Sequence, residues 1–243
     1  MTELSILIPV FNDQEVLPEL IKRLIPVLES LTPQYEIIFV DDGSSDNSFD
    51  ILKRYREKNS KIKILKLTEN FGQSNAISAG LEKVTGEIVI IMDSDLQDRP
   101  EDIPKLLNAL KDSNKQVAIA RWETKKASLC KTISANIFFQ ISNYITKIHH
   151  PPHLGVFRAF YREVYDKHIK PFDYSGTTLS QFYKLNLDYT VVSLQRDKRF
   201  AGKSGYDLKK MVKLALDRIL PNMKFVNQAS KRKPYYKIEQ FWG

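Results

Sequence analysis

Carboxylate side chains gather in three short segments of the sequence, each placed directly after a run of apolar residues. Asp13 follows the first run, Asp41 and Asp42 follow the second, and Asp93 and Asp95 follow the fourth. Turn formation or helix capping explains any one of these acids taken alone. Two acids at the spacing Asp-x-Asp, however, repel each other unless a cation or hydrogen-bond donors compensate. Carboxylate oxygens that leave positions open for water and phosphate suit Mg²⁺ or Mn²⁺, so the pair Asp93 and Asp95 predicts a divalent-cation site.

Strands and helices that could position these acids alternate along the first 120 residues. Short β-branched runs predict strands, and apolar residues at helical spacing predict helices between them. We expect strands at 5–10, 35–40, 62–67, 87–92 and 116–120, and helices at 15–31, 46–58, 74–83 and 101–111. A further strand is expected at 190–194. This alternation predicts an α/β fold, a doubly wound, mostly parallel sheet with helices on both faces. Because ligands lie at the carboxyl ends of the strands in such sheets, the acids stand where a ligand is expected.

Composition excludes several classes of protein. Cys130 is the only cysteine among 243 residues, which rules out an intramolecular disulfide and a Cys-rich zinc site. No apolar run approaches the roughly 18 to 20 residues of a membrane-spanning helix, and the first residues lead at once into a strand, so we expect neither a span nor a signal peptide. The glycine patterns of dinucleotide sites and P-loops do not occur, so phosphate would be bound by a metal and by side chains.

Charge is distributed unevenly along the chain. Residues 1–120 carry 14 Lys and Arg against 20 Asp and Glu, and residues 121–243 carry 23 against 9, so the second half has a net charge of +14. A basic field attracts nucleic acid, an anionic membrane surface or a phosphorylated substrate alike. No nucleic-acid-binding motif occurs, so we expect no nucleic acid as partner. Amphipathic stretches at 129–145 and 208–220 and the basic segment 231–237 favour peripheral contact with an anionic membrane surface.

Several segments together resemble the inverting glycosyltransferases of family 2, which have a GT-A fold. They are IPVFN at 8–12, VDDGSSD at 40–46, and NFGQSNA at 70–76, continued by GEIVIIMDSDLQDRPE at 86–101. Within that family the chain is most similar to the branch that uses polyprenyl phosphates, the dolichol-phosphate mannosyltransferase-like and undecaprenyl-phosphate glycosyltransferases. The residues specific to this branch are DSDLQ at 93–97, Pro100 with Glu101, and RFAGKSGY at 199–206.

The resemblance covers nearly the whole chain and implies a division into two parts. Residues 1–206 would form a GT-A domain, with a nucleotide-sugar-binding half at 1–120 and an acceptor half and closing loop at 121–206. Residues 207–243 would form a C-terminal amphipathic helix and a basic aromatic tail. The implied activity is metal-dependent transfer of a sugar from a nucleotide-diphosphate sugar, with UDP expected over GDP, to a polyprenyl phosphate. The implied location is the cytoplasm, at the inner face of the membrane.

Individual site residues follow from the same resemblance, position by position. Those implied for the donor are Pro9, Phe11, Asp13, Asp41, Asp42, Asp93, Ser94, Gln97, Lys203 and Ser204. The metal would be held by Asp93 and Asp95 with support from Gln97. An acceptor phosphate would meet Arg121 and Lys131. Arg199 would lie with Lys203 and Ser204 on a loop that closes over the diphosphate, so that Asp95, Arg121 and Arg199 carry the catalytic roles.

The nature of the acceptor stays open at this point. A phosphate monoester is already ionised near neutral pH, whereas a sugar hydroxyl needs a general base. No Glu-Asp or Asp-Asp pair follows residue 120, so Asp173 is the candidate base for a saccharide acceptor. On the acceptor side, residues 153–158 depart from the branch pattern, and the paired transmembrane helices common in the branch do not follow the 199–206 segment. A saccharide acceptor and a catalytically silent relative therefore stand as alternatives.

Overall fold

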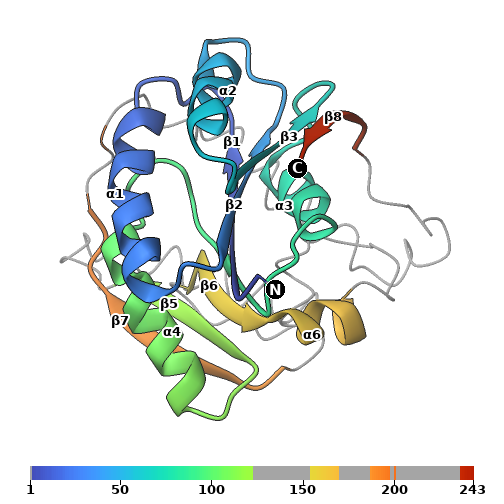
Figure 1. Ribbon diagram of the computed structural model, residues 1–243. Helices are drawn as coiled ribbons and strands as arrows, with labels where there is room; N and C mark the ends of the chain where they lie inside the picture. Colours follow the sequence, from blue (N-terminus) through green and yellow to red (C-terminus); the bar gives the residue numbers. More distant parts are fainter. Residues whose placement is uncertain (1, 123–153, 170–186, 198–199, 201–235) are drawn as a thin grey trace, which may run out of the picture.

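The computed structural model describes residues 2–122, 154–169, 187–197, 200 and 236–243. An eight-stranded sheet runs through its centre, with helices packed on both faces (Figure 1). The strands are β1 (Leu4–Val10), β2 (Tyr35–Asp41), β3 (Ile62–Leu67), β4 (Ile88–Ile91), β5 (Val117–Trp122), β6 (Leu154–Tyr161), β7 (Tyr189–Leu194) and β8 (Ile238–Trp242). The helices are α1 (Leu17–Leu31), α2 (Ser48–Lys58), α3 (Gln73–Leu81), η1 (Pro100–Asp102), α4 (Ile103–Asp112), α6 (Arg162–Val164) and η2 (Tyr165–Ile169).

The order of strands across the sheet is β7-β5-β6-β4-β1-β2-β3-β8. β6 runs antiparallel to its neighbours β4 and β5, and β8 runs antiparallel to β3. The remaining pairs are parallel. The predicted α/β class with a mostly parallel sheet is confirmed. Because β1, β2, β4, β5 and β7 all point the same way, the segments that follow them emerge at one edge of the sheet.

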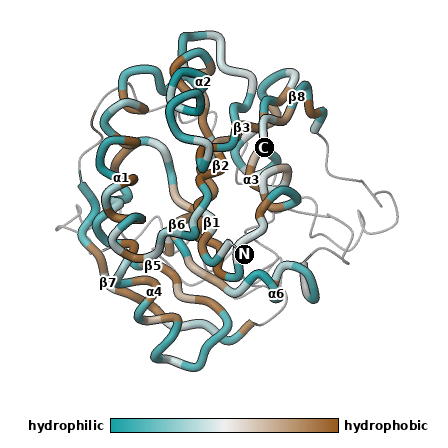
Figure 2. The backbone as a smooth tube through the Cα atoms, in the orientation of Figure 1, coloured by the Kyte–Doolittle hydropathy of each residue, from teal (hydrophilic) through white to brown (hydrophobic). Residues whose placement is uncertain are grey.

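Side chains alternate between the two faces of the central strands and so divide the core into two clusters. Ile6 and Ile8 of β1 face the cluster that contains α1, α2 and α4, whereas Leu7 faces the cluster that contains α3. The central strands are buried on both faces, which explains why they read as continuous apolar runs. Figure 2 shows this as hydrophobic colour along the central strands and along one side of the helices.

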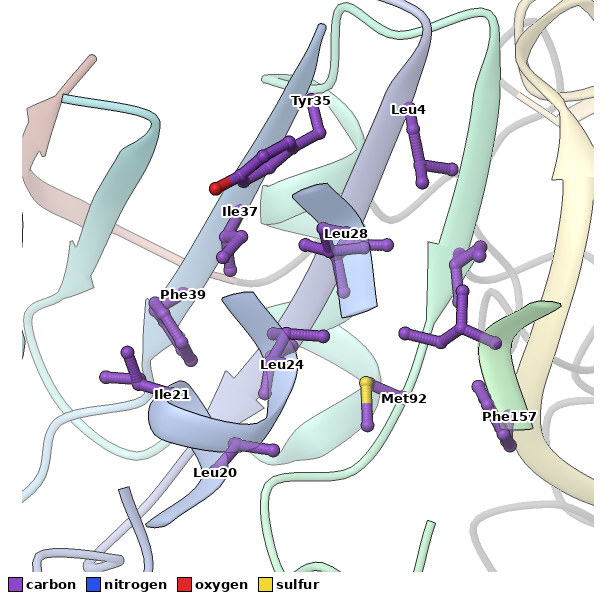
Figure 3. Packing of buried hydrophobic residues seen from close by; sticks show 14 of the residues in the cluster. Leu4, Leu20, Ile21, Leu24, Leu28, Tyr35, Ile37, Phe39, Met92 and Phe157 are labelled. Atoms are coloured by element: carbon purple, nitrogen blue, oxygen red, sulfur yellow. The ribbon is translucent and has the colours of Figure 1, made fainter. Parts of the chain in front are cut away.

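Helix α1 illustrates how local pattern produces packing. Its apolar residues recur at helical spacing, and the buried members are Leu17, Leu20, Ile21, Leu24 and Leu28. Figure 3 shows Ile21 beside Phe39 of β2, and Leu24 and Leu28 over the neighbouring strands. Full burial of one such leucine contributes roughly 1.5 to 3 kcal/mol. The helix thereby fixes the position of β1 and β2, whose ends carry the acids.

Most predicted boundaries agree with the structure to within one or two residues, and the strand expected at 62–67 agrees to the residue. Two strands are not predicted by the sequence analysis. β6 lies between β4 and β5 in the sheet, although in the sequence it comes after β5 and is separated from it by 31 residues. Residues 238–242, expected within a basic aromatic tail, form β8 and pair with β3. No helix within the described ranges has the length and apolar character needed to span a membrane.

Candidate active site

The segments that follow β1 and β4 are joined by a direct hydrogen bond. The hydroxyl of Ser94 donates to Oδ2 of Asp13 at 2.6 Å, and the same oxygen accepts the backbone N–H of Phe11 at 3.3 Å. β1 and β4 are neighbours in the sheet, so residues 81 positions apart in the sequence meet at its edge. The structure therefore brings Asp13 and Ser94 together, as the sequence analysis expects.

Backbone and side-chain hydrogen bonds hold the segment 92–99, here called the β4 loop. The N–H of Gln97 donates to Oδ1 of Asp95 at 3.1 Å, and the N–H of Asp93 donates to Oδ2 of Asp98 at 3.1 Å. Leu96 has a φ of 59° and is buried, a left-handed conformation that is uncommon for a leucine. Gln73, the first residue of α3, donates from Nε2 to Oδ1 of Asp93 at 2.6 Å. The Asp93 carboxylate is thus oriented from outside its own loop.

Burial raises the pKa of Asp93 to about 6, and the charge of Asp95 acts in the same direction. Burial raises the pKa of Asp98 well above its ordinary value, with the charge of Asp93 adding to it. Arg196 opposes both shifts, and its Nη2 lies 4.0 Å from Oδ2 of Asp93. Neighbouring acids whose ionised forms are disfavoured gain from a cation placed between them.

Asp93 and Asp95 are the residues of this loop that would hold a divalent cation. Within the residues that the structure describes, no group of three His, Cys, Asp or Glu side chains could hold a metal ion. Asp93 and Asp95 would therefore supply two carboxylates and leave the other positions to water and phosphate, which is how proteins commonly hold Mg²⁺. The Asp93 side chain is 20% exposed, so it is not enclosed in the apolar interior. At 4.0 Å, Arg196 is too distant to donate a hydrogen bond to it.

Asp41 is the last residue of β2, Asp42 follows it, and both are buried. Both oxygens of Asp42 accept backbone N–H groups, from Phe71 at 2.8 Å and from Gly72 at 2.9 Å. These bonds tie the segment before α3 to the end of β2. Burial raises the pKa of Asp42 to about 6. Oδ1 of Asp41 accepts the N–H of Ser44 at 3.3 Å, and burial raises its pKa as well. Asp42 thus holds the segment before α3 in place, and its contact with the donor stays a prediction.

The predicted donor residues on β1 differ in exposure. Pro9 is buried within β1, in register with Val40, whereas the Phe11 side chain is 45% exposed at the sheet edge. Asn12 has a φ of 55°, and its Oδ1 accepts the N–H of Ser45 at 2.8 Å. The loops after β1 and β2 are cross-linked in this way, which leaves the Phe11 ring facing solvent beside the acids.

Arg121 of β5 and the segment after β7 lie at the same edge of the sheet as the acids. Arg121 is exposed at the end of β5. The side chain of Gln97 contacts the segment after β7, where its Nε2 donates to the carbonyl oxygen of Asp197 at 3.3 Å. Gln73, Asp98 and Arg196 are members of the site that the sequence analysis does not assign. A signal existed for Arg196, because it follows a strand whose carboxyl end lies at the same edge.

Five predicted site residues lie outside the described residues. They are Lys131, Asp173, Arg199, Lys203 and Ser204. The amphipathic stretches at 129–145 and 208–220 lie outside them as well, together with most of the basic segment 231–237. Their roles stay predictions.

Comparison with known proteins decides the family. Residues 5–169 match the family model described as "Glycosyl transferase family 2". The chain belongs to this family. It is 33% identical over 215 residues to "Uncharacterized glycosyltransferase YkcC" of Bacillus subtilis (strain 168), covering 88% of this chain and 67% of that protein. It is 34% identical over 217 residues to "Uncharacterized glycosyltransferase sll0501" of Synechocystis sp., covering 89% and 68%. The prediction of a family 2 glycosyltransferase is confirmed.

Solved structures agree with the predicted fold of this family 2 member. Glucosyl-3-phosphoglycerate synthase from Mycobacterium tuberculosis, in complex with Mn²⁺, UDP and glucosyl-3-phosphoglycerate, aligns with a TM-score of 0.60 at 17% identity, covering 90% of this chain and 80% of that one. Its complex with Mg²⁺ and UDP aligns with a TM-score of 0.62 at 16% identity, covering 90% and 79%. At this identity the likeness establishes the fold. The ions in these neighbours are those expected from the Asp93 and Asp95 pair.

Proposed function

We propose that this family 2 glycosyltransferase moves a sugar from a nucleotide-diphosphate sugar to a polyprenyl phosphate. The observation that carries the proposal is the meeting of Asp13, Ser94 and the Asp93 and Asp95 pair at the carboxyl edge of the sheet. Carboxylates at this edge repel a diphosphate unless a cation lies between them. UDP and Mn²⁺ or Mg²⁺ in the fold neighbours support a uridine donor and a divalent cation.

Several of the described residues would each bind a different part of the donor. Asp93 and Asp95 would hold Mg²⁺ or Mn²⁺, which when bound stabilises the negative charge that develops on the departing diphosphate. Gln73 keeps one oxygen of Asp93 occupied and so orients the carboxylate. The exposed ring of Phe11 offers a face against which a base can stack. Asp13 is held by Ser94 close to Phe11, where it can accept a hydrogen bond from the nucleoside.

Charge on the acceptor side favours a lipid phosphate over a neutral sugar. Residues 121–243 carry a net charge of +14, and Arg121 is exposed at the same edge as the acids. A phosphate monoester is an ionised nucleophile that needs cations to hold it and no general base. This supports a place for the chain in the polyprenyl-phosphate branch and a peripheral position on an anionic membrane surface.

A screen of nucleotide sugars tests the proposal. Donor hydrolysis should depend on Mn²⁺ or Mg²⁺, and adding an undecaprenyl phosphate to the active donor should yield a glycosyl lipid phosphate. Asp95→Asn should abolish both reactions. Asp112→Asn, which removes an exposed acid at the far end of α4, should leave them unchanged. A donor that is turned over only with a saccharide, and no longer after Asp173→Asn, would replace the lipid acceptor by a sugar hydroxyl.

Membrane contact is a separate part of the proposal. The protein should co-sediment with vesicles that contain an anionic lipid, and the bound fraction should fall as salt is added, because each cation near such a surface contributes about 1 kcal/mol. Vesicles of phosphatidylcholine alone serve as the control. Binding that ignores salt, or no binding, would remove the membrane from the proposal.

A further inference from the structure

The indole ring of Trp122 is held firmly at the carboxyl end of β5. It stacks on Phe157 of the neighbouring strand β6, with ring centroids 6.4 Å apart and planes inclined by 13°. Gly155, also on β6, lets the backbone approach the other part of the ring, since a Cβ atom at this position would lie 2.6 Å from Nε1 of Trp122. The ring is thus fixed by its neighbours on β6.

Arg196 lies over this ring. Trp122 is in register with Leu194 at the end of β7, and two residues later the guanidinium carbon of Arg196 is 5.3 Å from the indole centroid. β5 and β7 lie side by side at one side of the sheet (Figure 1). An arginine stacked on tryptophan is restrained without using its N–H donors. Trp122 therefore places a guanidinium at the edge where the acids meet.

The stacked guanidinium faces the Asp93 carboxylate without being locked to it. Its Nη2 lies 4.0 Å from Oδ2 of Asp93, beyond hydrogen-bond distance. Toward the other described residues, Arg196 donates no hydrogen bond, and its side chain is 39% exposed. A guanidinium carries five N–H donors in a planar fork that matches phosphate oxygens. The geometry leaves this fork available beside the acids that would hold a cation.

The segment that carries Arg196 is attached to the β4 loop. The N–H of Asp197 donates to the carbonyl oxygen of Gln97 at 3.3 Å, and Nε2 of Gln97 returns a bond to the carbonyl oxygen of Asp197 at 3.3 Å. Nε of Arg99 lies 3.7 Å from Oδ2 of Asp197. These contacts fix the position of the segment that carries Arg196 relative to the β4 loop with Asp93 and Asp95.

We propose that Arg196 binds a phosphate oxygen of the donor diphosphate and that Trp122 is the residue that positions it. This inference rests on the proposed use of a nucleotide-diphosphate sugar and a divalent cation. Arg196 compensates the charge of Asp93 in the absence of donor, so it competes with a divalent cation for that carboxylate. With a nucleotide diphosphate present, the same guanidinium binds the phosphate. Arg196 therefore strengthens nucleotide binding and weakens the binding of a divalent cation alone.

These two roles predict opposite effects of one substitution. Arg196→Gln should bind Mg²⁺ alone about two- to five-fold more tightly, because a partly exposed ion pair no longer competes. It should bind UDP in saturating Mg²⁺ about ten-fold more weakly, because a charge-assisted hydrogen bond is lost. Arg196→Lys should restore the competition with Mg²⁺ and only part of the UDP affinity, because an ammonium lacks the planar fork. Arg162→Gln, at the start of α6, is the matched control and should change neither constant.

Tryptophan fluorescence reports on Arg196 without any turnover. The chain contains two tryptophans, so in a Trp242→Phe background Trp122 is the sole emitter. Titration with Mg²⁺ alone should change its emission as the guanidinium shifts over the ring, and Arg196→Gln should remove most of that change. Isothermal titration calorimetry supplies the two affinities. For Trp122 itself, Trp122→Leu should weaken UDP binding as Arg196→Gln does, and Trp122→Phe should restore much of it.

The outcomes separate this inference from the proposed function. If the wild-type protein binds Mg²⁺ and UDP but Arg196→Gln changes neither affinity, Arg196 has no part in the donor site and the inference fails alone. If both affinities fall together, Arg196 supports the loop structurally and the inference fails as well. If the wild-type protein binds neither Mg²⁺ nor UDP, the proposed function fails and this inference fails with it. Opposite changes in the two affinities support it.

Discussion

Replacing Asp95 by asparagine should stabilise the metal-free protein while it abolishes cation binding. Asparagine has the shape of aspartate, and its side-chain oxygen can still accept the N–H of Gln97, as Oδ1 of Asp95 does at 3.1 Å. The β4 loop should therefore keep its conformation and lose one negative charge. A residue whose removal improves folding and destroys binding is typical of a functional site.

The expected gain follows from the pKa of Asp93. Burial, and after it the charge of Asp95, raises this pKa from 3.8 to about 6. Raising the pKa of Asp93 from 3.8 to about 6 costs the folded protein about 3 kcal/mol of stability at neutral pH. Because burial is the larger cause, we assign about 1 kcal/mol to the charge of Asp95. The folded protein holds the Asp93 proton more tightly than the unfolded chain, so the free energy of unfolding falls as pH rises from 3.8 to about 6.

Urea unfolding in EDTA measures this effect. At neutral pH, Asp95→Asn should raise the free energy of unfolding by about 1 kcal/mol, and the gain should vanish at a pH where Asp93 is protonated in both states. Mg²⁺ at about 100 times its dissociation constant should then stabilise the wild-type protein by about 2.7 kcal/mol and leave the variant unchanged. Asp112→Asn is the control and should behave as wild type in both conditions. A variant that is less stable in EDTA, or that gains as much from Mg²⁺ as the wild type, would refute the reasoning.

Three further predictions concern the residues that support the site. Because burial raises the pKa of Asp42 to about 6, the free energy of unfolding in EDTA should fall between pH 4 and pH 6, and Asp42→Asn should reduce that slope in urea titrations; an unchanged slope contradicts the assignment. Lys63→Met should lower the free energy of unfolding by about 1 to 3 kcal/mol, since it leaves the buried Glu36 carboxylate without its cation at 2.7 Å; a loss near zero in thermal unfolding would show that the pair is solvated. Gly155→Ala should cost about 1 to 3 kcal/mol and shift the emission of Trp122, because the added methyl group would lie 2.6 Å from its ring nitrogen; unchanged emission would mean that β6 yields instead.

Much of the site could be anticipated from local pattern. Asp13, Asp93 and Ser94 follow strands whose apolar runs are visible in the sequence, and the rule that ligands lie at carboxyl ends places them together. The structure joins Ser94 to Asp13 at 2.6 Å, as this rule leads one to expect. The resemblance to family 2 rests on the same residues, and the family match over 5–169 confirms it.

Other features depend on contacts that no local pattern reports. β6 is inserted antiparallel between β4 and β5, which are consecutive strands along the chain. Both oxygens of Asp42, a predicted donor residue, accept N–H groups of a segment about 30 residues away, which its place in the sequence does not reveal. The side-chain nitrogen of Gln97, a predicted metal-supporting residue, donates to Asp197, 100 residues further along, and this contact too is not visible in the sequence. Such partners are chosen by the folded chain.

The sequence by itself determined the α/β class, most element boundaries and the edge at which the acids lie, because apolar periodicity and chain direction are properties of neighbouring residues. Only the tertiary structure decided how each acid is used. Gln73 and Arg196 reach Asp93 from α3 and from the end of β7, and burial then raises the pKa of this carboxyl group. Desolvation and through-space charge arise when distant segments pack together, so they are properties of the fold and not of any single stretch of sequence.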